Sequence, residues 1–598
     1  MNALADASRL RQRGNEELAS GAFAAAVTSY RAALVIEPGS VRAHNNLGQA
    51  LMRLDRRAEA MASYERAIEL DPGYAIAYNN LGIALHEQGA YEAALRCYER
   101  ALELNPSFAE AHNNLGNTLQ QLKRYDEAAR HFERLFDLVP DHQRALGAAF
   151  GARLACCDWT QYADASARIA AGVHAAQPVI QPFTFLAISD SPELQLRCAR
   201  IHVDNLLPAA ARLPWNGARY EHEKIRVAYL SADYHEHATA ALTAGLFEAH
   251  DRQRFETIAI SFGPDDSSAM RRRLEGAFDR FIDIRQMSDT QAVQLLQSLE
   301  IDIAVDLKGH TTRRLGLLAR RPAPVQVNYL GYPGTMGLEQ IDYILADPIV
   351  LPREQRCHYS ESVAYLPECY QVNDDRRVIA EVTPTRGELG LPPDGFVFCC
   401  FNNHYKITPA IFAVWMQLLQ QVPGSVLWLL EDNHAAARNL RREAQDGGVS
   451  AERLVFASRL GAAEHLARQR LADLFLDTLP YNAHTTASDA LWAGLPVLTC
   501  LGNAFPGRVA ASLLEAIGLS ELITHTLEEY AARAMELASD PGQLGALRVR
   551  LARNRGNHPL FDTGRFCRHL EAAYTVMWGR HREGLRPESF AVPPLRRA

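Results

Sequence analysis

Features that would mark a membrane-bound, exported or disulfide-stabilised protein are missing from these 598 residues. No run of about 18 uncharged apolar residues occurs, so no segment is predicted to span a membrane. The N-terminus, Met1 to Arg9, lacks the basic and then apolar layout of a secretion signal. The ten cysteines are scattered without a C-x-x-C spacing, which favours neither a zinc site nor a disulfide framework. We expect a reduced, cytoplasmic protein with no membrane partner.

Two common nucleotide-binding motifs are also absent. No G-x-G-x-x-G opens a βαβ unit, which argues against a nicotinamide or flavin cofactor, and no G-x-x-x-x-G-K-[ST] indicates a P-loop. A formal net charge of −8 argues against a broad nucleic-acid surface, so we expect no nucleic-acid partner. The apolar and charged fractions, 48% and 22%, are those of an ordinary globular protein.

The first 140 residues repeat with a period of 34. Each unit is predicted to form two amphipathic helices, with small residues where the helices cross closely, and the pattern matches the tetratricopeptide repeat. The recurring positions are Pro38, Pro72, Pro106 and Pro140; Tyr30, Tyr64, Tyr98 and Phe132; Ala26, Ala60, Ala94 and Ala128; and Gly14, Gly48, Gly82 and Gly116.

Three equivalent asparagines, Asn46, Asn80 and Asn114, recur within this array. On the concave surface of a superhelix, their amides would hold an extended peptide backbone through hydrogen bonds. Alternatively, they cap or bridge neighbouring helices. Both interpretations fit an array that binds a protein or peptide.

From residue 224 onward, short apolar strands alternate with helices in two tandem runs, and polar or glycine residues follow each strand. We therefore predict an N-terminal all-α tetratricopeptide superhelix followed by an α/β GT-B architecture, in which two Rossmann-like domains face a cleft. Nine strands are predicted, over residues 225–231, 255–262, 301–307, 325–330, 396–401, 425–430, 453–456, 474–477 and 496–499.

Five segments are predicted along the chain. They are 1–142 (tetratricopeptide repeats), 143–222 (degenerate helical repeats), 223–385 (first Rossmann-like half), 386–560 (second half, binding UDP) and 561–598 (C-terminal helix and tail). We expect the last helix to cross back to the first half.

The stretch from Leu479 to Leu498 is predicted to contain a turn, a short helix and a strand. Hydroxyls and an imidazole cluster where the helix begins, so its free N–H groups and positive dipole end would form a site for an anion such as a diphosphate. Gly494 and Pro496 are predicted to end the helix.

Taken in order, the motifs of this chain resemble those of O-linked N-acetylglucosamine transferase and its bacterial homologues. The motifs, after the repeats, are Cys157-Asp-Trp-Thr160, Arg321-Pro-Ala-Pro-Val-Gln326, Leu330-Gly-Tyr-Pro-Gly-Thr335, Phe401-Asn-x-x-Tyr-Lys406, Glu464-His465, His484-Thr-Thr486 and Leu491-Trp-Ala-Gly494. The resemblance implies inverting transfer of N-acetylglucosamine from UDP-GlcNAc to Ser or Thr of proteins, without a metal or other cofactor.

The resemblance also implies roles for residues of the second half. Lys406 would neutralise the charge that builds on the UDP leaving group. The triplet His484, Thr485 and Thr486 would bind the diphosphate. Asp489 would bind the ribose, although Thr486 to Asp489 also fits a capping box with Thr486 as N-cap.

The remaining donor-binding residues of the second half surround the nucleoside. His465 matches a histidine that contacts the uridine, and Arg468, three residues later, is predicted to lie on the same helical face. Leu460 and Asn403 are also expected to bind the donor, Asn403 standing where relatives often carry Gln. Ala462 falls where the mammalian form has a lysine.

In the first half, His237 matches the histidine of the active centre. It would act as the general base on the acceptor hydroxyl or position it. His235 is close enough to exchange roles with it in the alignment, and an H-x-H metal site lacks a third ligand at sensible spacing. His310 and the loop that contains Gly331 and Pro333 are expected either to face the sugar or to form a structural turn.

Three other functions remain open from the sequence. The first is a transferase of the same fold with another donor or acceptor: UDP-glucose, an asparagine or a carbohydrate. The second is a repeat scaffold that binds UDP with little activity. The third is a nucleotide-sugar epimerase, which does not account for the peptide-binding array.

Overall fold

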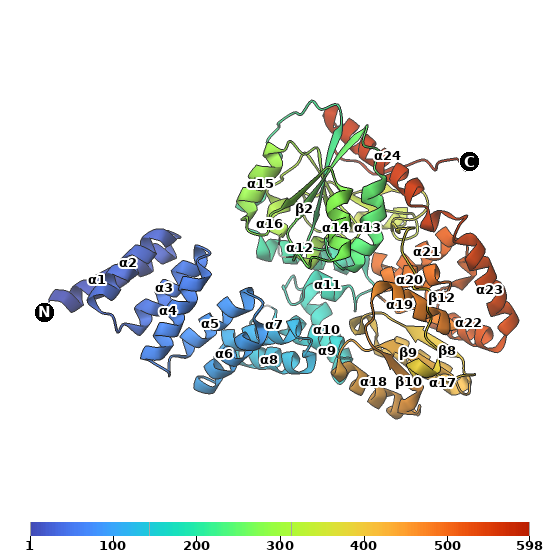
Figure 1. The fold of residues 1–598 in the computed structure, drawn as a ribbon, viewed down its shortest axis with the longest axis horizontal. Helices are drawn as coiled ribbons and strands as arrows, with labels where there is room; N and C mark the ends of the chain where they lie inside the picture. Colours follow the sequence, from blue (N-terminus) through green and yellow to red (C-terminus); the bar gives the residue numbers. More distant parts are fainter. Residues whose placement is uncertain (1, 143, 313, 597–598) are drawn as a thin grey trace. The chain divides into compact units, whose positions relative to one another are not determined.

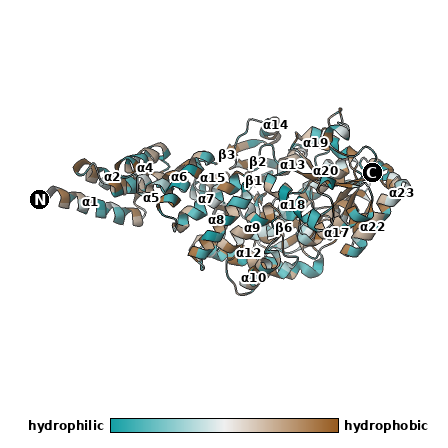
Figure 2. Cartoon of the chain, turned by 90° about the horizontal axis from the view of Figure 1, so that it is seen from below, coloured by the Kyte–Doolittle hydropathy of each residue, from teal (hydrophilic) through white to brown (hydrophobic). Residues whose placement is uncertain are grey.

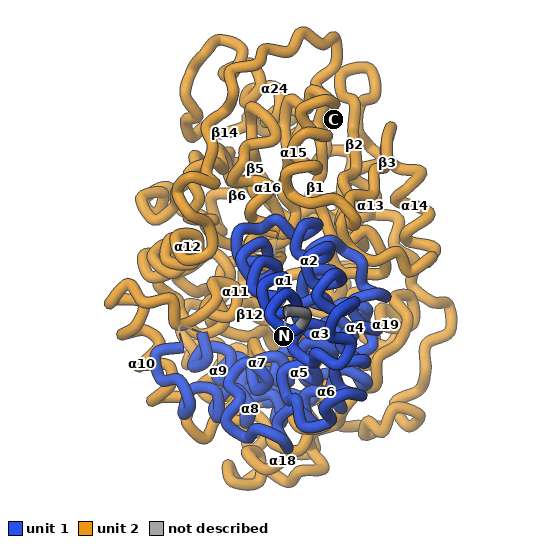
Figure 3. The backbone as a smooth tube through the Cα atoms, turned by 90° about the vertical axis from the view of Figure 1, so that its left-hand side faces the viewer, with its two compact units in different colours: residues 1–156 blue, residues 157–598 orange. Residues whose placement is uncertain are grey.

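The computed structural model describes residues 2–142, 144–312 and 314–596, and the chain divides into two compact units. Residues up to Cys156 form the first unit, and residues from Cys157 form the second (Figure 3). Gln143, where we expected the degenerate repeats to begin, and Ala598, where the tail ends, lie outside the described residues. Over the described ranges, no helix is long and apolar enough to cross a membrane.

The first unit consists of helices that pack in consecutive pairs, as the 34-residue period predicts (Figures 1 and 2). The small residues are needed at the crossings: a Cβ on Gly82 would lie 2.6 Å from the Tyr98 ring, and one on Gly48 would lie 2.5 Å from the Tyr64 ring. The helices are α1 (Asn2–Ala19), α2 (Phe23–Ile36), α3 (Val41–Arg53), α4 (Arg57–Leu70), α5 (Ala75–Glu87), α6 (Tyr91–Leu104), α7 (Ala109–Gln121), α8 (Tyr125–Leu138) and α9 (Ala145–Ala155).

The three equivalent asparagines bridge neighbouring repeats through their side-chain N–H groups. Asn46 donates to Asn15 at 3.0 Å, Asn80 to Asn45 at 2.9 Å and Asn114 to Asn79 at 3.0 Å, in each case to the side-chain oxygen. These hydrogen bonds support the interpretation that the asparagines bridge neighbouring helices. The three side chains remain only partly buried.

The second unit contains two parallel sheets. Among its described residues, the first sheet has the strand order β14-β7-β6-β5-β4-β1-β2-β3. Its strands are β1 (Ile225–Ser231), β2 (Phe255–Ser261), β3 (Arg280–Asp283), β4 (Ile303–Asp306), β5 (Val325–Asn328), β6 (Tyr343–Ala346), β7 (Ser362–Tyr365) and β14 (Phe590–Ala591). The second has the order β10-β9-β8-β11-β12-β13, with β8 (Val397–Cys400), β9 (Val426–Leu430), β10 (Leu454–Ala457), β11 (Leu474–Leu476), β12 (Val497–Cys500) and β13 (Ile523–Thr524).

Helices cover these sheets, and most strand residues are buried on both faces, as parallel sheets require (Figure 1). All nine strands predicted from the sequence are present. The helices are α10 (Tyr162–His174), α11 (Pro182–Phe185), α12 (Pro192–Leu206), α13 (Ala238–Ala249), α14 (Ala269–Ala277), α15 (Asp289–Ser298), α16 (Leu315–Ala319), α17 (Pro409–Gln421), α18 (His434–Asp446), α19 (Ala462–Arg468), α20 (Thr485–Ala493), α21 (Val509–Ile517), α22 (Leu527–Ser539), α23 (Pro541–Asn554) and α24 (Thr563–Arg582).

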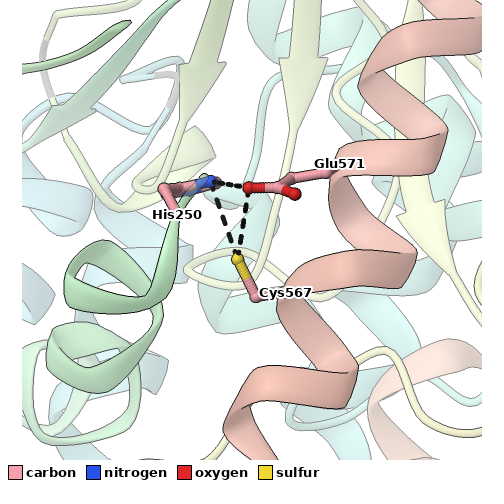
Figure 4. A group of neighbouring side chains, drawn as sticks. All are labelled: His250, Cys567 and Glu571. Carbon is pink, nitrogen blue, oxygen red and sulfur yellow. Dashed lines mark hydrogen bonds and ion pairs between the residues drawn. The ribbon is translucent and has the colours of Figure 1, made fainter. Parts of the chain in front are cut away.

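Helix α24 crosses back to the first half, as predicted, and packs against α13 and β5. A buried polar cluster fixes it there (Figure 4). Glu571 accepts hydrogen bonds from the Asp251 N–H at 2.8 Å and from His250 Nδ1 at 3.0 Å. The Cys567 thiol donates to the same carboxylate at 3.6 Å, and His250 Nε2 lies 2.8 Å from the Tyr229 hydroxyl.

This cluster makes the attachment of α24 sensitive to acid. Burial raises the pKa of Glu571, whereas the hydrogen bonds from His250 and the Asp251 N–H lower it. Together these bonds outweigh burial, so the pKa of the folded carboxyl lies below its ordinary value. Because the folded carboxyl has the lower pKa, its stabilisation is complete above the ordinary value of about 4.5 and is lost as the pH falls through the folded value.

We predict that Glu571→Gln lowers the free energy of unfolding by about 1–3 kcal/mol at pH 7, because buried donors then lose a charged acceptor. The difference from wild type should shrink at an acid pH below the ordinary value of about 4.5, where the native carboxyl begins to be protonated. Thermal unfolding at both pH values measures this, with the exposed Glu583→Gln as control. An equal difference at both pH values would contradict the prediction.

Candidate active site

Helix α20 begins directly after His484 and ends at Gly494, whose φ of 88° is the left-handed conformation predicted for a C-terminal glycine. The first N–H to bond back along the helix is that of Ser488, to the His484 carbonyl at 3.1 Å. The three preceding N–H groups, of residues 485–487, therefore have no helical carbonyl to bond. Together with the positive end of the helix dipole, they form an anion-binding helix start.

Lys406 lies in a 3₁₀ turn (His404–Lys406) that follows β8, and it is only 7% exposed. Its Nζ donates to the Asn482 carbonyl at 2.7 Å and lies 3.9 Å from the centre of the Tyr481 ring. Burial lowers the pKa of Lys406 to about 7, although the Asp477 carboxylate acts in the opposite direction. Since residues 481 and 482 belong to the turn before α20, the ammonium group lies beside the start of that helix.

The imidazole of His484 is neutral in this site. Burial and the nearby Lys406 cation lower the pKa of His484 well below its ordinary value. Its Nε2 lies 3.2 Å from the Pro506 carbonyl, to which the neutral ring donates. His484 therefore shapes the helix start without adding a positive charge to it.

Asp477, at the carboxyl end of β11, holds the turn that carries this site. Its Oδ1 accepts from the N–H groups of Thr478 at 2.7 Å and Ala483 at 2.6 Å, and its Oδ2 accepts from the Thr499 hydroxyl at 2.7 Å. Burial raises the pKa of Asp477 to about 6. We did not predict this residue, although its position at the end of a predicted strand was a usable signal.

Asn402 stands in the motif from Phe401 to Lys406, but the sequence analysis gave it no role. The Thr486 hydroxyl donates to Asn402 Oδ1, and Asn402 Nδ2 donates to Thr478 Oγ1 at 2.8 Å. Because the hydroxyl hydrogen of Thr486 is used inside the protein, its backbone N–H is the group it offers to an anion. Asn403, which we expected to bind the donor, has an exposed side chain and precedes the 3₁₀ turn.

His465 and Arg468 lie on one face of α19, as their spacing predicts. Arg468 Nη2 donates to His465 Nδ1 at 2.7 Å, and Nη1 donates to the Ser458 carbonyl at 2.5 Å. Burial and the Arg468 charge lower the pKa of His465 to about 4, so its ring is neutral and carries its proton on Nε2. Arg468 is 1% exposed and braces His465 from inside, whereas Leu460, just before α19, is 43% exposed.

The structure contradicts the capping-box interpretation of Thr486 and Asp489. The N-cap is His484, so Thr486 is already inside the helix and Asp489 lies two residues beyond the N3 position that completes a capping box. Asp489 Oδ1 instead accepts from Nη1 of Arg377, a residue of the connection between the two halves that the sequence analysis did not single out.

His237 caps α13 through its ring. Nδ1 accepts the Thr239 N–H at 3.1 Å, which leaves the proton of the neutral ring on Nε2. Nδ1 also lies 3.4 Å from Asp233 Oδ2, but both oxygens of that carboxylate bond Lys308 Nζ at 2.8 Å. Partial burial lowers the pKa of His237 more than the Asp233 carboxylate raises it. In this geometry, His237 is a hydrogen-bond donor through Nε2.

His310 and the loop after β5 pack against each other. His310 Nε2 lies 2.8 Å from the Met336 carbonyl, the ring centre lies 4.9 Å from that of Tyr332, and burial lowers the pKa of His310 to about 3. A Cβ on Gly331 would lie 1.8 Å from the Leu307 carbonyl oxygen, and Pro333 is buried in the same loop. This packing supports the structural-turn interpretation of Gly331.

The candidate residues follow strands of both sheets. His237 and His310 follow β1 and β4, and Lys406 and His484 follow β8 and β11. The halves are joined at α20: Gln371 Nε2 donates to Ser488 Oγ at 2.7 Å, and α13 contacts α20. The carboxyl ends of parallel strands are where open α/β sheets bind ligands.

Comparison with known proteins agrees with this architecture. A probable UDP-N-acetylglucosamine–peptide N-acetylglucosaminyltransferase of Arabidopsis thaliana is 35% identical over 432 residues, which are 69% of this chain and 44% of that relative. A UDP-N-acetylglucosamine–peptide N-acetylglucosaminyltransferase of Caenorhabditis elegans is 26% identical over 476 residues, 61% of this chain and 41% of that relative. The chain thus spans less than half the length of these curated relatives.

A solved structure of a mutant Thermobaculum terrenum O-GlcNAc transferase is 28% identical, covers 91% of this chain and 98% of its own, and superposes with a TM-score of 0.68. The predicted fold, a tetratricopeptide array followed by two parallel α/β sheets of GT-B type, is thereby confirmed.

Family models match both parts of the chain. Tetratricopeptide repeat models match residues 14–55, 58–89, 84–123 and 109–142. The model for glycosyl transferase family 41 matches residues 211–384 and 379–570, which contain the strands of the two sheets except β14. Because these ranges cover more than half of the chain, the protein belongs to glycosyl transferase family 41.

Proposed function

We propose that this protein is an inverting glycosyltransferase that moves N-acetylglucosamine from UDP-N-acetylglucosamine to Ser or Thr hydroxyls of proteins. Membership of family 41 and the names of the relatives support this donor and this acceptor. The observation that carries the proposal is the buried ammonium group of Lys406 beside the free N–H groups that open α20. A cation and fixed dipoles in one place suit a departing diphosphate.

The reaction is a direct displacement at the anomeric carbon. The oxygen of the acceptor hydroxyl forms a bond to that carbon on the face opposite UDP, while the bond to the diphosphate oxygen breaks and UDP leaves with the electron pair. The proton of the hydroxyl is released to water, because His237 already carries its ring proton on Nε2. Inversion to the β-linked product follows. Lys406 and the N–H groups of residues 485–487 stabilise the charge on UDP, so we expect no metal cofactor.

The nucleoside is assigned to the other residues of the second half. His465, braced by Arg468, offers its Nε2–H to the base, and the exposed Leu460 loop lies beside it. Asp489 accepts the ribose hydroxyls, and Asn403 lies at the exposed edge of the site.

The first half is assigned to the sugar and the acceptor. His237 is proposed to position the sugar or the acceptor by donating a hydrogen bond from Nε2, since its Nδ1 already accepts the Thr239 N–H. His310, Gly331 and Pro333 shape the wall behind the sugar. The ion pair of Asp233 with Lys308 holds the loop that carries His237.

We further propose that the protein acceptor runs along the tetratricopeptide array. The N–H groups of Asn46, Asn80 and Asn114 bridge repeats, and Asn46 Oδ1 also accepts from Asn45 Nδ2 at 3.1 Å. Because an amide oxygen has two lone pairs, each of these partly exposed side chains can still accept a peptide N–H. In this proposal, each of the five predicted segments has its own role. The repeats bind the acceptor, the degenerate repeats connect them to the catalytic part, the two halves carry out the reaction, and the C-terminal helix joins the two halves. A reducing, cytoplasmic setting fits ten cysteines that form no disulfide.

A transfer assay with several labelled UDP-sugars and a peptide mixture tests the reaction. We expect transfer of N-acetylglucosamine and a loss of about 10²–10³ in kcat for Lys406→Ala, because a charge fixed at the leaving group acts mainly in the transition state. The exposed Lys224→Ala is the matched control and should leave kcat unchanged.

Each result of this assay has a distinct meaning. Transfer undiminished by Lys406→Ala would remove the catalytic assignment. Tight UDP binding without transfer from any UDP-sugar would support the scaffold alternative, and preferential transfer of glucose would replace the donor.

The array is tested by changing Asn46, Asn80 and Asn114 together to Ala. We predict that KM rises more than about tenfold for folded protein acceptors and less than about threefold for short peptides, because only long chains reach several amides. The exposed Gln121→Ala in the same array is the control. Equal effects on both acceptors, or a melted array by circular dichroism, would leave the amides with a purely structural role.

A further inference from the structure

The connection between the two halves touches both helices that are expected to hold the nucleoside. This connector, residues 374–386, leaves the first sheet region and enters the second half before β8. The Ala380 N–H donates to the Ala463 carbonyl at 3.1 Å, at the start of α19. Three residues earlier, Arg377 reaches α20. The connector is therefore a third element beside the proposed nucleoside site.

Arg377 is fixed to one face of α20 by its main chain and its side chain. Its Nη1 donates to Asp489 Oδ1, and its carbonyl accepts the Trp492 indole N–H at 3.2 Å. The guanidinium carbon lies 5.9 Å from the centre of the Trp492 ring. Asp489 and Trp492 are three residues apart, so they lie on the same helical face.

The ion pair of Arg377 with Asp489 is interior: the two side chains are 8% and 16% exposed. Such a pair is oriented as well as charged, since a guanidinium holds a carboxylate in one plane. Arg377 occupies Oδ1, which leaves Oδ2 of Asp489 for a hydroxyl of a ligand.

Two further donors of Arg377 point to a missing ligand. Its Nε and Nη2 are buried and have no hydrogen-bond partner among the described residues. Unpaired buried donors are rare because they lose water without compensation, and an oxygen-rich ligand at this position would supply the missing acceptors. A ribose presents two hydroxyl oxygens close together.

We propose that Arg377 is a positioning residue for the donor, which holds the Asp489 carboxylate toward the ribose and makes the enzyme select ribonucleotides over deoxyribonucleotides. The inference rests on the proposed UDP-sugar donor and on Asp489 as its ribose ligand. It adds that the connector, and not only the second half, determines nucleoside specificity.

Calorimetric titration with UDP, 2′-deoxy-UDP and 3′-deoxy-UDP tests the proposal on the full-length protein. We expect wild type to prefer UDP over at least one deoxy analogue by about 10- to 100-fold, as a hydrogen bond to a charged group provides. In Arg377→Met, this ratio should fall to about threefold or less. The KM for the UDP-sugar should rise, while kcat at saturation stays within about threefold.

The chain offers a matched control in the preceding residue. Arg376 has a side chain that is 68% exposed and pairs with Glu248 at 3.1 Å. Arg376→Met removes the same charge from the same connector and should keep the wild-type ratio. If Arg377→Met does not fold, Arg377→Lys, which keeps the cation but not its planar geometry, should still lower the ratio.

A double-mutant cycle separates positioning from general stability. Asp489→Asn combined with Arg377→Met should lose no more selectivity than Asp489→Asn alone, because one residue acts through the other. Additive losses, or an unchanged ratio in Arg377→Met, would overturn the proposal. If the wild type binds all three nucleotides equally, both the Arg377 proposal and the ribose role of Asp489 are wrong. Intact transfer activity in the same sample would then still support the proposed function.

Discussion

The buried amino group of Lys406 in the second half is the constraint on which the candidate site depends. Removing an ammonium group from water is costly unless polar groups replace the water. For Lys406, these groups are the Asn482 carbonyl, the face of the Tyr481 ring and, at longer range, the Asp477 carboxylate. All three belong to the chain between β11 and α20, so the residues that accommodate the cation are the same ones that place the start of α20.

Buried polar contacts have two roles in the second unit: some fix a loop within one half, and others join the two halves. In the first half, the ion pair of Asp233 with Lys308 and the cap formed by His237 fix the loop after β1. Elsewhere, polar contacts join the halves: Glu571 on α24 binds the end of α13, and Gln371 binds Ser488 on α20. A substrate between such halves meets groups that are already oriented, which is the condition for electrostatic stabilisation of a transition state.

Local patterns predicted most of the fold, and long-range contacts determined what they missed. The 34-residue period follows from glycine packed under aromatic rings, and long apolar runs marked nine strands. Strand β14 has two residues and exists only because the tail reaches β7. The capping box failed because α20 begins at Thr485, within a turn organised by Asp477. The role of Arg377 could not be predicted from local sequence, because its partner Asp489 is 112 residues away. The role of Lys406 came from family resemblance, and the anion site at the start of α20 came both from the physics of helix starts and from that resemblance. The ring protonation of His237 required the structure.

Proton uptake on donor binding tests the central claim most directly. Without donor, burial lowers the pKa of Lys406 to about 7, and the charge of a bound diphosphate should raise that pKa. At pH 8, calorimetry with UDP-N-acetylglucosamine in buffers of different ionisation enthalpy should therefore show uptake of about one proton per site, falling toward zero at pH 6, where the lysine is already charged. The uptake should vanish in Lys406→Met. Binding at pH 8 without proton uptake, or uptake that persists in this variant, would contradict the account.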